Sequence, residues 1–337
     1  MSLRIAYLTG EYPRATDTFI QREVAGLRAL GLEVETCSIR RTGAEHHTGP
    51  EQCAEAARTF HVLEGTLSPR LLRALLGAWR HPLRWFSALR LAWRTSPGGL
   101  RALAYQMIYL AEATVLAQHL RARGVTHIHN HIAKSSGTVA MLASQITGIP
   151  FSFTLHGPDI FYEPHRWRLD EKIARARFVA CISHFSRAQA MVFSDPAHWD
   201  KLHIVHCGVD PARYERPRRE TGAHLVFVGR LAAVKGVPVL FEALRGLIAD
   251  HPDLRLTLVG DWPERAALEA RAGDLRGRVD FLGYRSQAEV AGLLRDATAL
   301  VLPSFAEGLP VVLMEALAAR VPVVATRIAG VAELVED

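Results

Sequence analysis

Residues 305–316 read FAEGLPVVLMEA, and this stretch decides the fold of the C-terminal half of the chain. The apolar run 299–302 precedes it and the apolar run 321–325 follows it, and both are typical of buried strands. Pro310 favours the start of a helix, because its fixed φ angle suits the first helical turn and its missing N–H is not needed there. The pattern therefore predicts strand, loop, helix and strand, the repeating unit of a parallel α/β sheet.

The loop inside this unit has the properties of a ligand-binding loop. Loops that follow the strands of a parallel sheet lie at its carboxyl edge, where ligands bind. Gly308 lets the backbone come close to a ligand, and the first N–H groups of the helix then face an anion. Glu315 lies among apolar residues, so a buried carboxylate there needs donors such as sugar hydroxyls or a basic side chain. A partly exposed helix glutamate is the alternative.

Length and composition predict two globular domains without a disulfide framework. The 337 residues are 49% hydrophobic and 22% charged, which suits two cores of ordinary size and argues against disorder. The four cysteines have no C-x-x-C spacing, which indicates a reducing compartment. No apolar stretch is long enough for a signal peptide or a spanning helix, so we expect a cytoplasmic protein. The net charge of +6 favours anionic partners.

The N-terminal half opens with the same alternation of strand, helix and strand. The first strand ends at residue 10, a helix covers 19–30, and a second strand covers 32–39. The loop between them has no G-x-G-x-x-G fingerprint, which argues against a dehydrogenase. Its polar residues Asp17 and Thr18 are either substrate contacts or a plain helix cap.

Histidines mark the ends of two later strands. Residues 126–131 read THIHNH, which predicts a strand running into a loop with its three histidines on one face. Since no cysteine or carboxylate neighbours them, we expect no metal, and we expect His131 to point into a polar cleft. The strand 151–155 delivers His156 at its carboxyl end, where an α/β site recruits such a residue.

The segment 67–104 differs in character from the rest of the chain. It contains seven arginines and no acidic residue, and Pro82 and the PGG at 97–99 divide it into short helices. Basic helices that carry tryptophan and leucine suit the interface of an anionic membrane. The alternatives are helices packed on the domain with solvated or paired arginines, and a nucleic-acid surface, for which no motif is present.

The second half restarts the alternation after a polar linker. The apolar strand 224–228 leads to Arg230 and Lys235, two cations at the first β–α turn, which together suit a diphosphate. An ordinary solvated loop is the alternative. Further strands are expected at 254–259, 279–282, 299–302 and 321–325. We therefore expect an N-terminal domain over 1–207, a linker over 208–221 and a C-terminal domain over 222–337.

Taken together, these motifs resemble those of retaining glycosyltransferases of family 4, and within it enzymes of colanic acid type exopolysaccharide assembly. The matching motifs are EYP at 11–13, DTFI at 17–20, FTLHGPDI at 153–160, CGVD at 207–210, VGR at 228–230, KG at 235–236, FLG at 281–283 and the E-x7-E pair of Glu307 and Glu315. The resemblance implies the GT-B architecture, in which two Rossmann-like doubly wound domains face a cleft. The insert 67–104 is the least family-like part.

The resemblance also implies roles on the donor side of the cleft. Arg230 and Lys235 would hold the donor's diphosphate with the backbone N–H groups of Gly308 and Leu309. Glu315 would bind the ribose hydroxyls, and Glu307 would contact hydroxyls of the transferred sugar. Tyr284 and Arg285 would border the base. On the other side, His156 would lie beside the reacting centre, and the acceptor would face Asp17, Thr18 and His131.

The expected activity is transfer of a sugar from a nucleotide-diphosphate donor to a saccharide or lipid-linked acceptor, with retention of configuration. No Asp-x-Asp pair occurs in the chain, so we expect cations from side chains and no metal or other cofactor. A nucleotide-sugar epimerase and a non-catalytic binding module are the alternatives, and we expect no nucleic-acid partner. The family usually continues beyond the point at which this chain stops, so we expect a truncated C-terminal end. We expect peripheral contact with the inner face of the cell membrane.

Overall fold

The computed structural model describes residues 3–66, 69–157, 163–215, 217, 222–261 and 263–336. The chain divides into two compact units. The first unit comprises Met1–Pro13, Glu23–Gly43 and Cys53–His206, and the second comprises Arg14–Arg22, Ala44–Gln52 and Cys207–Asp337. The domain limits expected from the sequence stay a prediction.

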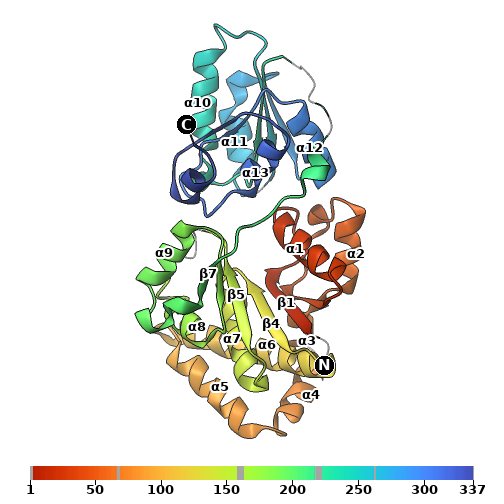
Figure 1. Ribbon diagram of the computed structural model, residues 1–337, viewed down its shortest axis with the longest axis vertical. Coiled ribbons are helices and arrows are strands. Elements are labelled where there is room, and N and C mark those ends of the chain that lie inside the picture. Colours follow the sequence, from red (N-terminus) through yellow and green to blue (C-terminus); the bar gives the residue numbers. More distant parts are fainter. Residues whose placement is uncertain are drawn as a thin grey trace. The chain divides into compact units, whose positions relative to one another are not determined.

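The first unit is built on a seven-stranded sheet in which every pair of neighbouring strands is parallel. The strand order is β3-β2-β1-β4-β5-β6-β7, so the chain winds outward from β1 in both directions. Figure 1 shows β1, β4, β5 and β7 in this order. The strands are β1 (Arg4–Glu11), β2 (Glu33–Arg40), β3 (Phe60–His61), β4 (His127–His131), β5 (Phe151–Leu155), β6 (Val179–Cys181) and β7 (Leu202–Ile204).

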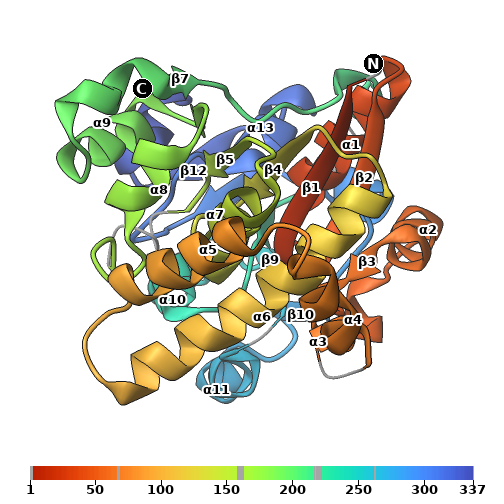
Figure 2. The same ribbon diagram turned by 90° about the horizontal axis from the view of Figure 1, so that it is seen from below.

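Helices connect these strands, as parallel neighbours require. In the described residues 69–104, two short helices begin at Pro69 and Pro82, and a long helix begins after Gly99, earlier than the sequence predicts; Figure 2 shows α5 beside α6. The helices are α1 (Thr18–Ala29), α2 (Pro50–Arg58), α3 (Val62–Thr66), α4 (Pro69–Ala78), α5 (Pro82–Arg94), α6 (Leu100–Ala122), α7 (Ser135–Thr147), α8 (Leu169–Arg175) and α9 (His184–Val192).

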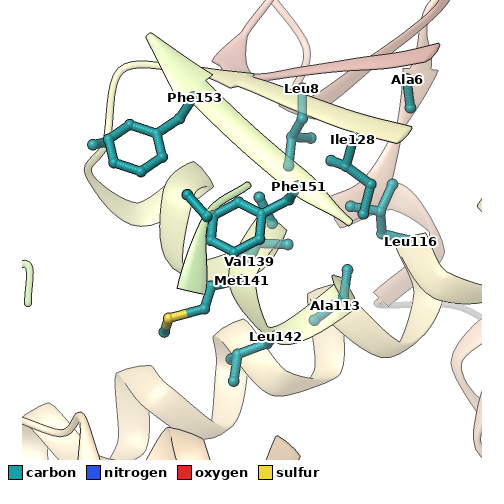
Figure 3. Close-up of a cluster of buried hydrophobic side chains, with 14 of the residues drawn as sticks. Ala6, Leu8, Ala113, Leu116, Ile128, Val139, Met141, Leu142, Phe151 and Phe153 are labelled. Atoms are coloured by element: carbon teal, nitrogen blue, oxygen red, sulfur yellow. The ribbon is translucent and has the colours of Figure 1, made fainter. Parts of the chain in front are cut away.

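The core of the first unit lies between the sheet and these helices. Figure 3 shows Phe151 of β5 and Ile128 of β4 packed with apolar side chains of α7, among them Val139 and Met141. All of these residues are at most 2% exposed. The parallel strands β4 and β5 are held by this buried packing, so the residues at their carboxyl ends have fixed positions. These residues include His131 and His156.

The second unit contains a five-stranded parallel sheet of order β10-β9-β8-β11-β12. Its strands are β8 (His224–Val228), β9 (Arg255–Val259), β10 (Val279–Gly283), β11 (Ala299–Leu302) and β12 (Val323–Ala325), and each lies where an apolar run predicts it. Its helices are α10 (Val237–Leu247), α11 (Arg265–Arg271), α12 (Gln287–Arg295) and α13 (Val311–Ala318). The predicted fold class, two Rossmann-like α/β domains, is confirmed.

None of the helices in the described part of the chain combines the length and the apolar character that crossing a membrane requires.

Candidate functional site

Two loops meet at the carboxyl edge of the second sheet. They follow β8 and β11, which are neighbouring strands, and the N–H of Phe305 donates to the carbonyl of Val234 at 2.8 Å. Gly236 has a φ of +67°, and a Cβ there would lie 2.1 Å from the carbonyl oxygen of Pro303. The close approach of the two loops therefore depends on glycine.

Lys235 and Glu307 are brought together by these loops. The Lys235 Nζ donates to Glu307 Oε1 at 2.5 Å, and the hydroxyl of Ser304 donates to the same oxygen at 2.6 Å. Glu307 is only 6% exposed, so its charge depends on these two donors. Lys235 and Glu307 are among the residues predicted from the sequence, whereas Ser304 is not, although it directly precedes the loop 305–309.

Gly308 and Leu309 lie between this pair and α13. Both are buried, and the helix begins two residues after Leu309, with Pro310 at its N-cap position. The helix thus starts one residue after the predicted Pro310. The backbone N–H groups of Gly308 and Leu309 thus lie just before the first turn of α13, the position at which the sequence predicts contact with an anion.

Glu315 of α13 is 7% exposed and has a basic partner. Arg22, in the Arg14–Arg22 segment of the second unit, donates to its carboxylate through Nη2 and to Gln287 through Nε at 3.2 Å. Burial beside Glu315 also raises the pKa of Tyr214, which therefore remains a donor. The sequence predicts that this carboxylate needs either sugar hydroxyls or a basic side chain as donors, and in the structure Arg22 is that basic side chain.

Arg230, Tyr284 and Asp17 influence one another electrostatically within the second unit. Burial raises the pKa of the Asp17 carboxyl. The charge of Arg14 lowers this pKa most, and Arg230 lowers it less. Burial likewise raises the pKa of Tyr284 against the effect of Arg14 and Arg230. Arg230 itself is exposed at the end of β8, which leaves its guanidinium accessible to a ligand.

Two further predicted residues follow members of this group directly in the sequence. Thr18 is the first residue of α1, and the hydroxyl of Thr16 donates to the Asp17 carboxylate at 2.9 Å. Arg285 follows β10, where its Nη1 donates to the carbonyl of Tyr284 at 3.1 Å.

The histidines of the first unit form a buried cluster at the ends of β4 and β5. His129 contacts the hydroxyls of Ser152 and Thr154 at 2.7 and 2.9 Å, and His131 Nδ1 lies 2.7 Å from His156 Nε2. Burial lowers the pKa of His129 and of His156 to about 3, and lowers that of His131 well below its usual value. These rings are therefore neutral at pH 7. The last part of the FTLHGPDI motif, 158–160, lies outside the described residues.

The fold brings a carboxylate next to these histidines, although none is adjacent to them in the sequence, and the expectation of no metal stays a prediction. Glu23 of α1 places Oε2 at 3.7 Å from His131 Nε2, and one ligand atom from each of Glu23, His129 and His131 falls within 4.8 Å of the others. Both ring nitrogens of His129 already contact hydroxyl groups, so an ion would have to displace one of them. A metal ion there would therefore compete with hydrogen bonds that the fold already makes.

Lys172 fixes the loop that follows β4. Its side chain is fully buried, and Nζ donates to the carbonyl oxygens of Ala133 and Lys134 at 2.7 and 2.9 Å. Burial lowers its pKa to about 7. The amine thus holds the backbone directly after His131, a role that no local sequence pattern indicates.

Comparisons with known proteins agree with this geometry. Residues 17–213 match the family model described as Glycosyltransferase Family 4, and residues 222–337 match the model described as Glycosyl transferases group 1. The two matches together span both units.

Individual proteins match most of the chain. TuaC of Bacillus subtilis, named as a teichuronic acid biosynthesis glycosyltransferase, is 28% identical over 98% of this chain and 83% of its own length. WcaL of Escherichia coli, named as a colanic acid biosynthesis glycosyltransferase, is 26% identical over 99% of this chain and 85% of its own. The crystal structure of Anabaena HepE in complex with UDP and glucose has a TM-score of 0.61 at 18% identity, covering 99% of this chain and 83% of that one.

Proposed function

The chain belongs to Glycosyltransferase Family 4, and from this premise we propose that it transfers a sugar from a nucleotide-diphosphate donor to a saccharide or lipid-linked saccharide acceptor. The proposed reaction retains the configuration at the anomeric carbon of the transferred sugar. We assign it to exopolysaccharide or other cell-surface polysaccharide biosynthesis, because TuaC and WcaL are named for such biosynthesis.

The observation that supports this proposal most directly is the group of side chains at the carboxyl edge of the second sheet. Lys235 and Glu307 meet there at 2.5 Å, and Arg230 follows β8 at the same edge. Ammonium and guanidinium groups bind a diphosphate, and a carboxylate accepts hydrogen bonds from sugar hydroxyls. The group therefore offers contacts to both parts of one nucleotide sugar.

The proposed mechanism depends on where charge develops. The diphosphate gains negative charge as its bond to C1 of the sugar breaks, so fixed cations there stabilise the transition state more than the bound donor. Arg230 and Lys235 supply these cations, with backbone N–H groups of Gly308 and Leu309 as further donors. The acceptor hydroxyl attacks C1 on the face that the diphosphate leaves, and its proton passes to the departing phosphate oxygen.

The remaining predicted residues take positions around this centre. We assign Glu315 to the ribose hydroxyls, Glu307 to the transferred sugar and His156 to the side of the reacting carbon. Tyr284 and Arg285 border the base, and Asp17, Thr18 and His131 face the acceptor. The reaction proceeds without a metal cofactor, because the chain has no Asp-x-Asp pair and the two cations replace it.

A donor screen tests the proposal. The purified protein is incubated with UDP-, GDP- and dTDP-sugars and with acceptors such as lipid-linked saccharides, and nucleotide release is followed beside the sugar product. We expect release from one donor class that depends on acceptor, and we expect Lys235→Ala to lower the rate roughly 10²- to 10³-fold. Lys201→Ala, whose amine contacts the Ala174 carbonyl in the first unit, is the matched control.

Other outcomes of this screen identify the alternatives. An epimerase would change the sugar of the donor without an acceptor. A binding module would bind donor without releasing nucleotide, and full activity of Lys235→Ala would remove the assigned diphosphate site.

We also propose that the outer face of α4 and α5 contacts an anionic membrane. Leu83, Trp79 and Trp93 are 84%, 72% and 71% exposed, whereas the side chains turned inward include Ala88 and Ala92, which are fully buried. Large apolar side chains are thus exposed while alanines pack against the unit. Exposed tryptophans among arginines are typical of helices that lie in a membrane interface.

Some arginines of the segment 67–104 have partners within the protein, so the tryptophans are the better residues to change in a test of membrane binding. Arg84 donates to the Thr147 carbonyl at 2.5 Å and Arg94 lies 3.8 Å from Glu171, whereas Arg73 and Arg90 are exposed. These contacts agree in part with the alternative that the arginines serve packing. We further propose that this contact is with the inner face of the cell membrane.

Vesicle flotation measures this contact. We expect the protein to float with phosphatidylglycerol vesicles and less with phosphatidylcholine, and the variant Trp79→Ala with Trp93→Ala to lose most of its binding. Trp199→Ala, on a different surface segment, is the matched control. Equal flotation of the double variant and the wild type would remove the proposal.

A further inference from the structure

One face of α6 carries a row of polar and aromatic side chains that the proposed function does not use. Arg101, Tyr105, Tyr109 and Glu112 follow one another at intervals of four, four and three residues, so they lie on one side of the helix. Exposure falls along this row, because Arg101 and Tyr105 are exposed, Tyr109 is partly buried and Glu112 is only 3% exposed. The row therefore leads from solvent to a buried carboxylate.

The buried end of this row has no partner in the protein. Glu112 makes no hydrogen bond or ion pair with any residue that the structure describes, and its Oε2 is buried without a donor. Burial raises the pKa of Glu112 to about 7, and the charge of Arg40 opposes this rise only in part. Since a buried carboxyl group without a donor is costly, its position marks a place where a ligand can supply the missing hydrogen bonds.

Two arginines from other elements act on the same row. Arg40, the last residue of β2, opposes the rise in the pKa of both Glu112 and Tyr109, and Arg166 opposes that of Tyr109. Arg166 donates to Glu163 at 2.7 Å. In contrast, the exposed guanidinium of Arg40 has no hydrogen bond or ion pair with the described part of the chain. Arg40 is therefore available to an anionic group that lies near Glu112.

This row is separate from the histidine cluster at the ends of β4 and β5. Ala113 and Leu116 of α6 pack with Leu8 and Ile128 on one face of the first sheet, as Figure 3 shows. Successive side chains of a strand point to opposite faces, so His131 lies on the face opposite to Ile128. A ligand on α6 would therefore leave the histidines untouched.

We propose that this face of α6, together with Arg40, is a binding site for an acidic saccharide. Hydroxyls of such a ligand donate to Glu112, and its carboxylate accepts from the planar fork of donors on Arg40. The rings of Tyr105 and Tyr109, whose centroids lie 6.3 Å apart, offer faces to the apolar sides of sugar rings. A neutral sugar would leave Arg40 without an anion, and a plain anion would leave Glu112 without a donor. The inference goes beyond the proposed function, because binding needs neither a donor substrate nor transfer.

Isothermal titration calorimetry of the full chain with trigalacturonate, a trisaccharide of uronic acids, tests this site. Maltotriose is the neutral sugar of the same length, and inorganic phosphate is the anion without a sugar. We expect trigalacturonate to bind roughly 10-fold more tightly than either compound, since each lacks one of the two contacts. Equal affinity for maltotriose or for phosphate would overturn the assignment to an acidic saccharide, and so would the absence of binding to trigalacturonate.

Replacing Arg40 locates the ligand. Arg40→Ala should weaken the binding of trigalacturonate roughly 10-fold, because it removes a hydrogen bond to a charged group. Arg41→Ala is the matched control, since the guanidinium of Arg41 already donates to the carboxylate of Glu64. Unchanged affinity in Arg40→Ala, or an equal loss in both variants, would overturn the site.

Replacing Glu112 separates ligand binding from a structural role. Glu112→Leu should keep or raise Tm, because it removes a buried carboxyl group without a partner, and it should weaken the binding of trigalacturonate roughly 10-fold. A lower Tm with unchanged binding would show that Glu112 only supports the fold, and would overturn the inference. A protein that binds trigalacturonate in this way but transfers no sugar would refute the proposed function alone.

Discussion

Replacing Lys235 by Met isolates the contribution of the Lys235–Glu307 pair. Met has a similar length and no charge, so the variant keeps much of the packing while the Glu307 carboxylate loses its charged partner. Its remaining donor is the hydroxyl of Ser304 at 2.6 Å. The variant therefore leaves a buried charge with one neutral hydrogen bond.

The magnitude follows from burial. Breaking a fully buried ion pair by removing one partner costs about 3–5 kcal/mol. The Lys235 side chain is 16% exposed and that of Glu307 is 8%, so solvent reduces the cost slightly. We expect Lys235→Met to lower the free energy of unfolding by about 2–4 kcal/mol. Adding Glu307→Gln should restore most of this loss, because it removes the unpaired charge.

Urea unfolding of the full chain measures these differences, followed at pH 7 by a signal that reports the second unit. The wild type, Lys235→Met, Glu307→Gln and the double variant form a double-mutant cycle. The cycle gives the coupling energy between the two side chains after the effects of the single substitutions are subtracted. If Lys235→Met unfolds at the wild-type urea concentration, the pair is solvated and the reasoning from burial is wrong. If the double variant is no more stable than Lys235→Met, the loss comes from packing and not from the uncompensated carboxylate.

Three further predictions concern backbone, protonation and metal. Gly236→Ala should cost more stability than Gly277→Ala, since both glycines have a positive φ but only at Gly236 would the Cβ meet the Pro303 carbonyl; equal midpoints in thermal unfolding would refute this. The lowered pKa of Lys172, about 7, means that above this pH the amine is deprotonated in the folded protein but still protonated in the unfolded chain. The contribution of Lys172 to the free energy of unfolding should therefore rise between pH 7 and 8.5, by up to about 1.4 kcal/mol per pH unit. The difference between wild type and Lys172→Met, measured by urea unfolding, should carry that slope, and parallel pH profiles would contradict it. Addition of EDTA should leave the transfer rate unchanged, and loss of activity that Mg²⁺ restores would show that the two cations do not suffice.

The elements with a local cause were predictable from the sequence. Continuous apolar runs predicted the five strands of the second sheet, since strands of a parallel sheet are buried on both faces. Pro82 predicted the start of α5 because proline suits the first helical turn. In contrast, α2 and β3 lie in a stretch with no clear hydrophobic period, and tertiary packing rather than local pattern determines them.

The partners within the site were not predictable to the same degree. Lys235 and Glu307 were selected separately, because each follows a strand, and the adjacency of β8 and β11 is what brings them together. Glu23 and His131 are more than 100 residues apart, and nothing in the spacing of either one indicates the other. A single sequence predicts that a buried charge needs a partner, but the fold selects which residue supplies it.

The two glutamates of the stretch FAEGLPVVLMEA now have different requirements for ligand binding. Glu307 is paired with Lys235, so a sugar hydroxyl that donates to Glu307 and a phosphate that accepts from Lys235 are compatible with the pair as it stands. Glu315 is paired with Arg22 through one carboxylate oxygen, so ribose hydroxyls that donate to this carboxylate share it with the guanidinium. Where a ribose hydroxyl takes the position of the Arg22 contact, the free energy of that contact counts against the affinity for the donor. Removing the guanidinium with Arg22→Met would leave a buried carboxylate that the ribose hydroxyls then satisfy, so the donor should bind more tightly to a less stable protein.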